Sequence, residues 1–311
     1  MIPQIKLPMN AKMPMVGFGT RLITNESCKK TVAIAIDAGY RHIDTAEQYQ
    51  NEHGVGSAIR QCIESGKTVR DELFITTKLW PGNIQWGQQP KNTKTTILAL
   101  NESLKRLQMQ YVDLYLIHAP MSKKERLAQW RGMLELQQQG KARAIGVSNF
   151  SWRHIEEISA AGLPLPEVNQ IELHPWAQKP AFIDYLRDQG IVPTAYSSLL
   201  PLPTWRSAKG HHNTKSDEMI ADGNCKNSPL KRIAKKYGVA ESQLLLRWGI
   251  QKGYPVIPKS IHPERIQQNL DIFSFNIDQC DIVTISAMNR GAGFARSNDD
   301  PSRRLKINTT V

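Results

Sequence analysis

No apolar stretch of the sequence approaches the roughly 18 residues that a membrane-spanning helix needs, so we expect no membrane association. The chain has 4 cysteines, and none of them lies in a Cys-x-x-Cys pair. This absence argues against a disulfide framework or a zinc site and favours reduced thiols. The segment from Met1 to Lys6 lacks the long apolar core of a secretion signal. We therefore expect a cytoplasmic protein.

Two further absences exclude classes of ligand. The formal net charge is +12, but the basic residues are dispersed, and no arginine-rich run is interleaved with aromatic residues. We therefore expect no nucleic-acid binding. A multiply phosphorylated small ligand would account for part of the positive charge. We also expect no bound metal ion, because the adjacent His211 and His212 belong to no recognisable ligand set.

What the sequence does contain is an ordinary globular composition, with 40% hydrophobic and 22% charged residues. No linker or low-complexity tract divides it, so we expect residues 1–311 to form one domain. Short strand-like runs alternate with amphipathic helices along the chain. The expected strands are Met15 to Gly19, Tyr40 to Asp44, Leu73 to Lys78, Val112 to Ile117, Ala144 to Val147, Val168 to Ile171, Ile191 to Tyr196 and Tyr254 to Pro258. This α/β alternation predicts a (β/α)₈ TIM barrel.

Three segments fall outside the repeating units. Residues 1–14 are expected to form a hairpin that closes the barrel floor. Residues 200–227 form a long segment after the seventh strand, which we interpret as a loop that covers cofactor or substrate. The tail, 289–311, is expected to border the pocket.

Polar residues close three of the early strands. Asp44, Lys78 and His118 each end a separate apolar run, and Tyr49 follows Asp44 closely. Because the carboxyl ends of parallel barrel strands meet at one rim, we expect these four side chains to gather there. A lysine, a carboxylate, an imidazole and a phenol can together deliver a proton to a carbonyl oxygen. Each residue alone also has a plain structural explanation, such as a solvated lysine, a core histidine or a capping aspartate.

Several motifs resemble the aldo-keto reductase family, over about residues 5 to 290. They are Gly39–Ala46 with Tyr49, Asn51, Glu52, Val55 and Gly56, then Gly140–Phe150, Asn169–Pro175 and Ile257–Ser260. The resemblance implies a barrel that reduces carbonyl compounds with NADPH, and we expect a monomer. It places the family's catalytic tetrad on Asp44, Tyr49, Lys78 and His118.

The chemistry of the tetrad can also be argued from the residues themselves. A tyrosine with a pKa near 10 holds its proton at neutral pH but gives it up poorly. A cationic Lys78 should make Tyr49 a stronger acid, and Asp44 should keep Lys78 charged. His118 should donate a hydrogen bond to the substrate oxygen.

A second set of residues is expected to hold NADP(H). No complete Gly-x-Gly-x-x-Gly follows a strand, so a Rossmann site is not expected, and the dinucleotide should lie across the barrel rim. The amides and hydroxyls of Ser148, Asn149 and Gln170 suit a carboxamide, and the Tyr196 ring could stack on a nicotinamide. They could equally be ordinary strand-end hydrogen bonders. Thr20, Asp44 and Ser197 complete the expected contacts at this end of the cofactor.

The far end of the cofactor is expected beyond the last strand. Lys259, Ser260, Arg265 and Asn269 resemble the family's pocket for the adenosine 2′-phosphate. Two cations, a hydroxyl and a helix start at Pro263 would suit a phosphate, which predicts a preference for NADPH. The alternative is a solvated basic helix start.

The expected substrate residues are Arg21, Tyr49, Trp80, His118 and Ala119. Many relatives have tryptophan where this chain has Arg21, and some have tryptophan where it has Ala119. The pocket should therefore be more open and less aromatic, and Arg21 could attract an anionic group or simply be a surface residue. Two rival functions remain at this stage. One is a redox-silent family member with a regulatory or structural role, and the other is a barrel hydrolase or isomerase, for which we find no paired carboxylates or metal cluster.

Overall fold

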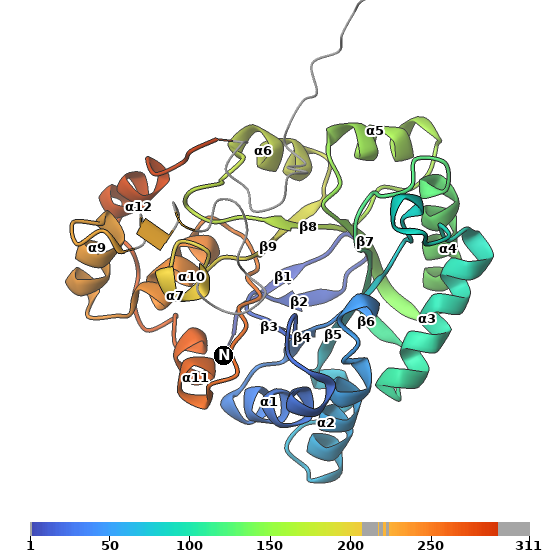
Figure 1. Cartoon of the computed structure of the whole chain (residues 1–311), viewed down its shortest axis with the longest axis horizontal. Helices are drawn as coiled ribbons and strands as arrows, with labels where there is room; N and C mark the ends of the chain where they lie inside the picture. The colour runs from blue at the N-terminus through green and yellow to red at the C-terminus, as the bar shows by residue number, and fades with distance from the viewer. Residues whose placement is uncertain (1, 207–216, 218–219, 222–223, 292–311) are drawn as a thin grey trace, which may run out of the picture.

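The computed structural model describes residues 2–206, 217, 220–221 and 224–291. A seven-stranded parallel sheet curls through its centre in the order β3-β4-β5-β6-β7-β8-β9 (Figure 1). Every residue of β4, β5, β6 and β8 is buried, as expected for a parallel sheet covered on both faces. The strands are β3 (Phe18–Gly19), β4 (His42–Asp44), β5 (Phe74–Leu79), β6 (Val112–Ile117), β7 (Ala142–Ser148), β8 (Val168–Glu172) and β9 (Val192–Tyr196).

The eighth barrel position is filled by a segment around Val256 that pairs too briefly to form a regular strand. Val256 makes parallel bridges to Val16 on one side and to Ala195 of β9 on the other, which closes the sheet into a barrel. Pro255 and Pro258 have no N–H group and cannot donate to a ladder, which explains why the predicted strand is reduced to bridges. The predicted (β/α)₈ barrel is confirmed.

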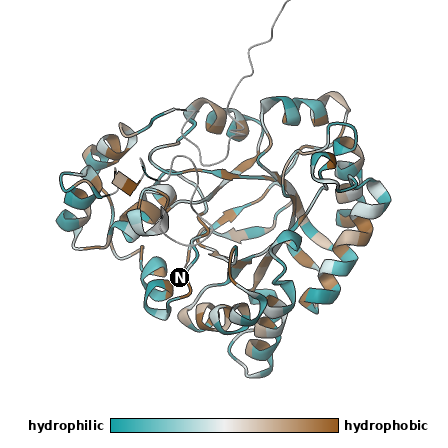
Figure 2. Cartoon of the chain, in the orientation of Figure 1, coloured by the Kyte–Doolittle hydropathy of each residue, from teal (hydrophilic) through white to brown (hydrophobic). Residues whose placement is uncertain are grey.

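Helices surround the sheet, as Figure 1 shows, and carry both hydrophilic and hydrophobic residues, as expected for amphipathic helices (Figure 2). Gly39 ends the first of them in the left-handed conformation (φ 110°), which glycine adopts without steric cost. Two helices were not predicted, the short one at Pro203–Arg206, within the segment expected to be a loop, and the last one at Gln279–Ser286. The α-helices in the described residues are α1 (Asn25–Ala38), α2 (Glu52–Glu64), α3 (Thr93–Leu107), α4 (Arg126–Gln138), α5 (Trp152–Ala160), α6 (Pro180–Asp188), α7 (Pro203–Arg206), α9 (Pro229–Tyr237), α10 (Glu241–Gln251), α11 (Pro263–Leu270) and α12 (Gln279–Ser286).

The N-terminal hairpin consists of β1 (Gln4–Lys6) and β2 (Lys12–Pro14), which pair antiparallel. Its residues Leu7 and Met13 are buried in one apolar cluster with residues of the barrel strands, among them Leu114 and Val168. The Met9 N–H also donates a hydrogen bond to the carboxylate of Glu167, just before β8 (3.0 Å). The predicted hairpin is therefore present and packs against the amino-terminal ends of the strands.

The other two irregular segments are described in part. The expected loop 200–227 contains the short helix α7, and its residues 207–216, 218–219 and 222–223 lie outside the described residues, as do residues 292–311 of the tail. At the start of the tail, the Arg290 N–H donates to the carbonyl of Trp176 (3.0 Å), so the chain returns to the segment after β8. Within the described residues no helix is long and apolar enough to cross a membrane.

Candidate active site

The carboxyl ends of β4 and β5 bring an ion pair into the barrel. Lys78 lies near the end of β5, and its ammonium donates hydrogen bonds to the Asp44 carboxylate at the end of β4 and to the carbonyl of Thr45 (2.9 Å). Lys78 is 0% exposed and Asp44 is 1% exposed, so water cannot replace either partner. The other carboxylate oxygen of Asp44 accepts from the amide of Gln170 (2.8 Å), which fixes the aspartate from the opposite side of the barrel.

Tyr49 and His118 face each other beside this ion pair. Tyr49 lies in the short 3₁₀ helix η1 (Glu47–Tyr49) that follows β4, and its ring centre is 5.1 Å from the Lys78 ammonium. The ring of His118, which directly follows β6, meets it edge to face at 5.5 Å. Trp80, after β5, meets the other side of His118 edge to face at 5.7 Å. The structure thus brings all four predicted tetrad residues together, with Trp80 beside them.

Burial and charge determine the protonation states of these groups. Burial raises the pKa of Tyr49, while the Lys78 ammonium acts in the opposite direction. Burial works to lower the pKa of Lys78, but the carboxylate of Asp44 and the nearby phenol raise it above its ordinary value, so the lysine stays charged. Burial, reinforced by Lys78 and Arg21, holds the pKa of His118 well below its usual range, so the imidazole is neutral. The expected effect of Lys78 on the phenol is present, but burial outweighs it.

The predicted nicotinamide residues form one hydrogen-bonded chain at the ends of β7, β8 and β9. The Ser148 hydroxyl donates to the Gln170 carbonyl (2.7 Å), and the Asn149 amide donates to the His118 carbonyl (3.1 Å). The Tyr196 hydroxyl in turn donates to the Asn149 side-chain oxygen (2.8 Å). The side-chain oxygen of Gln170 makes no hydrogen bond to the described residues and remains able to accept one. This donor and acceptor set fits a carboxamide.

Two residues of this rim adopt an unusual backbone conformation. Asn149 (φ 62°) and Ser197 (φ 56°) lie in the left-handed region directly after β7 and β9. Non-glycine residues rarely occupy this region, and such strain is concentrated at functional sites. Thr20, the third predicted residue at this end of the cofactor, has a structural contact. Its hydroxyl donates a hydrogen bond to the Asp44 carbonyl (3.0 Å), which joins the segment after β3 to the end of β4.

Three of the predicted phosphate residues, Lys259, Ser260 and Arg265, lie before or in the first turn of α11, and Asn269 lies in its last turn. Lys259 is half-buried with no acidic partner among the described residues, and burial lowers its pKa. Ser260 is buried and accepts a hydrogen bond from the His262 N–H (3.1 Å). Asn269 is buried, whereas Arg265 is exposed. An unpaired half-buried cation beside a helix start is a setting that an anionic group would stabilise, so these residues fit a phosphate.

The residues expected to contact substrate differ in exposure. Trp80, His118 and Ala119 are partly exposed at the rim, as Tyr49 is. Arg21 is exposed, in line with the surface alternative. Its charge nevertheless reaches the pocket, because it helps to lower the pKa of His118 and opposes the rise in the pKa of Tyr49. Arg21 is therefore a positive charge close to the site.

Two residues that contact the predicted site residues were not themselves predicted from the sequence. The Thr45 carbonyl is a partner of Lys78, and no side-chain signal could have revealed a backbone contact. Glu47 accepts a hydrogen bond from the Trp80 N–H (2.8 Å) and pairs with Lys91 (3.1 Å). Its only signal was its place two residues before Tyr49.

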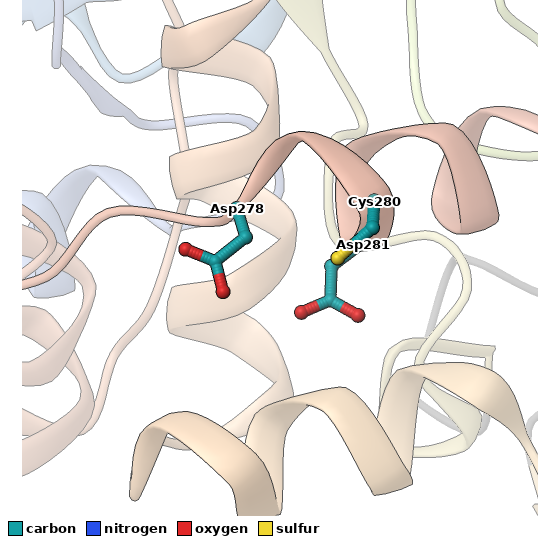
Figure 3. A group of neighbouring side chains, drawn as sticks. All are labelled: Asp278, Cys280 and Asp281. Carbon is teal, nitrogen blue, oxygen red and sulfur yellow. The ribbon is translucent and has the colours of Figure 1, made fainter.

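One group of potential metal ligands occurs among the described residues, away from the tetrad, at the start of α12. Asp278, Cys280 and Asp281 lie close together there (Figure 3). The ammonium of Lys236 on α9 already bonds both carboxylates, at 2.9 and 2.6 Å. The group is thus explained as a salt bridge that joins two helices.

Comparison with known proteins places the chain in a family. The sequence model of the aldo/keto reductase family matches residues 15–290. The chain is 39% identical to a glyoxal reductase of Bacillus subtilis (strain 168), covering 95% of this chain and 96% of the relative. It is 36% identical to an NAD(P)H-dependent D-xylose reductase of Candida tropicalis, with 94% of each covered.

Solved structures show the same relationship. A Bombyx mori aldo-keto reductase crystallised in complex with NADP is 34% identical, with a TM-score of 0.81 and 93% of each chain covered. An aldo/keto reductase from Brucella melitensis is 36% identical, with a TM-score of 0.77, covering 93% of this chain and 100% of that one. This chain belongs to the aldo/keto reductase family.

Proposed function

We propose that this protein reduces aldehydes and ketones to alcohols with NADPH, and that Tyr49 is the general acid. The observation that carries the proposal is the buried Lys78–Asp44 ion pair beside the Tyr49 ring, with the neutral imidazole of His118 opposite. The curated relatives named above are reductases, which favours turnover over the redox-silent alternative. Membership of an oxidoreductase family argues equally against a hydrolase or isomerase.

The bound cofactor supplies the hydride, and the chain supplies orientation and the proton. Tyr49 donates its hydroxyl proton to the carbonyl oxygen as negative charge develops there. The Lys78 ammonium stabilises the resulting tyrosinate, and Asp44 keeps that ammonium charged. His118, neutral at pH 7, donates a hydrogen bond to the same oxygen and so fixes the direction of the carbonyl.

The residues that would hold the cofactor follow the rim of the barrel. Gln170, Asn149 and Ser148 would hold the carboxamide of the nicotinamide, and the Tyr196 ring would pack on its face. Lys259 and Arg265 would bind the 2′-phosphate, which supports a preference for NADPH over NADH.

For substrate, we infer small carbonyl compounds, by analogy with the glyoxal and D-xylose reductases it resembles. The exposed Arg21 at the mouth would favour neutral or anionic compounds over cationic ones. We also expect a monomer in the cytoplasm.

The decisive test compares wild type with Tyr49→Phe. NADPH oxidation is measured with a panel of glyoxal, methylglyoxal, xylose, aromatic aldehydes and keto acids. Loss of the phenolic proton should lower kcat by about 10²–10⁴-fold while NADPH binding, followed by fluorescence, is retained. Unchanged turnover would remove Tyr49 as the acid, and NADPH binding without turnover by wild type would support the redox-silent alternative.

A further inference from the structure

Glu47 connects the turn that carries Tyr49 to the loop that carries Trp80. It begins the 3₁₀ helix η1, which ends at Tyr49. One carboxylate oxygen accepts the Trp80 N–H (2.8 Å), and the other lies 3.1 Å from the Lys91 ammonium. Lys91 also donates to the Trp80 carbonyl, so both backbone polar groups of Trp80 are bound by this one ion pair.

The ion pair is shielded from solvent. The side chains of Lys91 and Glu47 are 20% and 26% exposed, whereas those of Lys105 and Glu102 on α3 are 72% and 56% exposed. Since water screens exposed pairs most strongly, Glu47 and Lys91 should hold their geometry better than a surface pair does. Gln129 of α4 adds a further anchor by donating to the Lys91 carbonyl (2.9 Å).

This pair lies behind an aromatic wall, the stacked indole rings of Trp80 and Trp86, which begins at His118. The Trp80 ring meets His118 edge to face, and the Trp86 ring stacks on Trp80 at 5.9 Å with 13° between the planes. Trp86 lies in the 3₁₀ helix η3 (Ile84–Trp86), where it is 60% exposed and Ile84 is 71% exposed. So little of η3 is buried that core packing cannot fix the wall. The ion pair holds the backbone of Trp80, whose indole N–H donates to the exposed side chain of Gln88 (2.7 Å).

We propose that the Glu47–Lys91 ion pair is a positioning device that holds the Trp80–Trp86 wall over His118 and thereby favours carbonyl substrates with an aromatic group. The inference deepens the proposed function, because it assigns a substrate preference to the same site. When the carbonyl group of an aromatic aldehyde reaches Tyr49 and His118, its ring would extend along the two indoles. A small aliphatic carbonyl would reach the acid without touching Trp86.

The test measures kcat and KM for benzaldehyde and for methylglyoxal in Glu47→Ala, Lys91→Met and Trp86→Ala. Each variant should raise KM for benzaldehyde by about 3- to 10-fold, the size of one aromatic contact, while kcat and the values for methylglyoxal change less than about 2-fold. Lys91→Arg should restore the wild-type ratio of kcat/KM values, and the double variant Lys91→Met/Trp86→Ala should be no worse than either single variant. Lys105→Met, which breaks the exposed pair on α3, is the matched control.

A benzaldehyde-to-methylglyoxal ratio that stays at the wild-type value in Lys91→Met and Glu47→Ala would overturn the positioning role. Equal losses for both substrates would overturn it as well, because they would indicate a merely structural pair. Neither result bears on the proposed reaction, which is tested separately. The proposed reaction fails if Tyr49→Phe turns over substrate as fast as wild type. If Glu47→Ala does not fold, Lys91→Met and Lys91→Arg still decide the question.

Discussion

The surroundings of Lys78 strongly limit which side chains could replace it. It is fully buried, and its ammonium faces a carboxylate, a backbone carbonyl and a phenol ring. Removal of one partner of a buried pair leaves the other charge uncompensated. A substitution of Lys78 should therefore lower both the catalytic rate and the stability of the fold.

Lys78→Met should lower kcat for carbonyl reduction by about 10²–10⁴-fold, since the tyrosinate loses its counter-charge. The same change should lower the free energy of unfolding by about 3–5 kcal/mol, since Asp44 stays buried. NADPH oxidation and urea denaturation measure the two effects. Lys67→Met, which removes a partly exposed pair with Asp37, is the control and should change neither quantity appreciably.

The prediction for Arg265 concerns cofactor choice. Arg265→Ala should weaken NADPH binding by about 10-fold or more, because a charge-assisted phosphate contact is lost, and should leave NADH binding nearly unchanged. Dissociation constants from fluorescence titration check this. Gln268→Ala, an exposed position of the same helix α11, is the matched control. Equal weakening of both cofactors would refute the phosphate role.

At the scale of the elements, close helix contacts determine how the outer layer packs. Gly56 of α2 faces the carboxyl end of α3, where a Cβ atom would lie 2.2 Å from the Leu107 carbonyl oxygen. A backbone oxygen cannot move aside as a flexible side chain can, so α2 and α3 would have to separate.

Gly56→Ala should therefore destabilise the fold by about 1–3 kcal/mol, although alanine is the better helix former by ~1 kcal/mol. Thermal unfolding measures the change. His53→Ala on the exposed face of the same helix should be neutral or slightly stabilising. A more stable Gly56→Ala variant would show that the helices tolerate the shift.

At the scale of the whole molecule, buried neutral imidazoles make stability depend on pH. Burial lowers the pKa of His42, at the start of β4, to about 4, and that of His154 on α5 also to about 4. Below pH 6.5 the unfolded chain takes up protons that the folded chain refuses, so stability is full above pH 6.5 and falls as pH drops towards 4.

The free energy of unfolding should fall by roughly 2–3 kcal/mol between pH 7 and 4.5 through His42 alone. Urea denaturation across this range measures it. His42→Gln should be less stable at pH 7 but show a shallower slope, while His53→Gln on the surface should keep the wild-type slope. An unaltered slope in His42→Gln would mean that this imidazole does not stay neutral on folding.

The order of strands and helices, and the three polar strand ends with Tyr49 close behind the first of them, could be read from the sequence because periodicity, caps and the parallel sheet are local or repeating features. The sequence could not show that the eighth strand would be reduced to isolated bridges. Whether Pro255 and Pro258 permit a ladder depends on which neighbours they meet. Helix α12 was missed because it is short and its apolar positions give little periodic signal.

Residue types and their spacing thus determined the barrel, the family resemblance and the set of candidate residues. Tertiary structure alone decided which partners those residues meet: Gln170 on Asp44 across the barrel, Thr45 on Lys78, and Glu47 with Lys91 around Trp80. The net direction of each pKa shift was decided there too, because burial is a property of the assembled core. It opposes the effect of the neighbouring charges at Lys78 and is reinforced by them at His118. Contacts between segments distant in the chain leave no periodic signal along it, so they emerge only when the barrel closes.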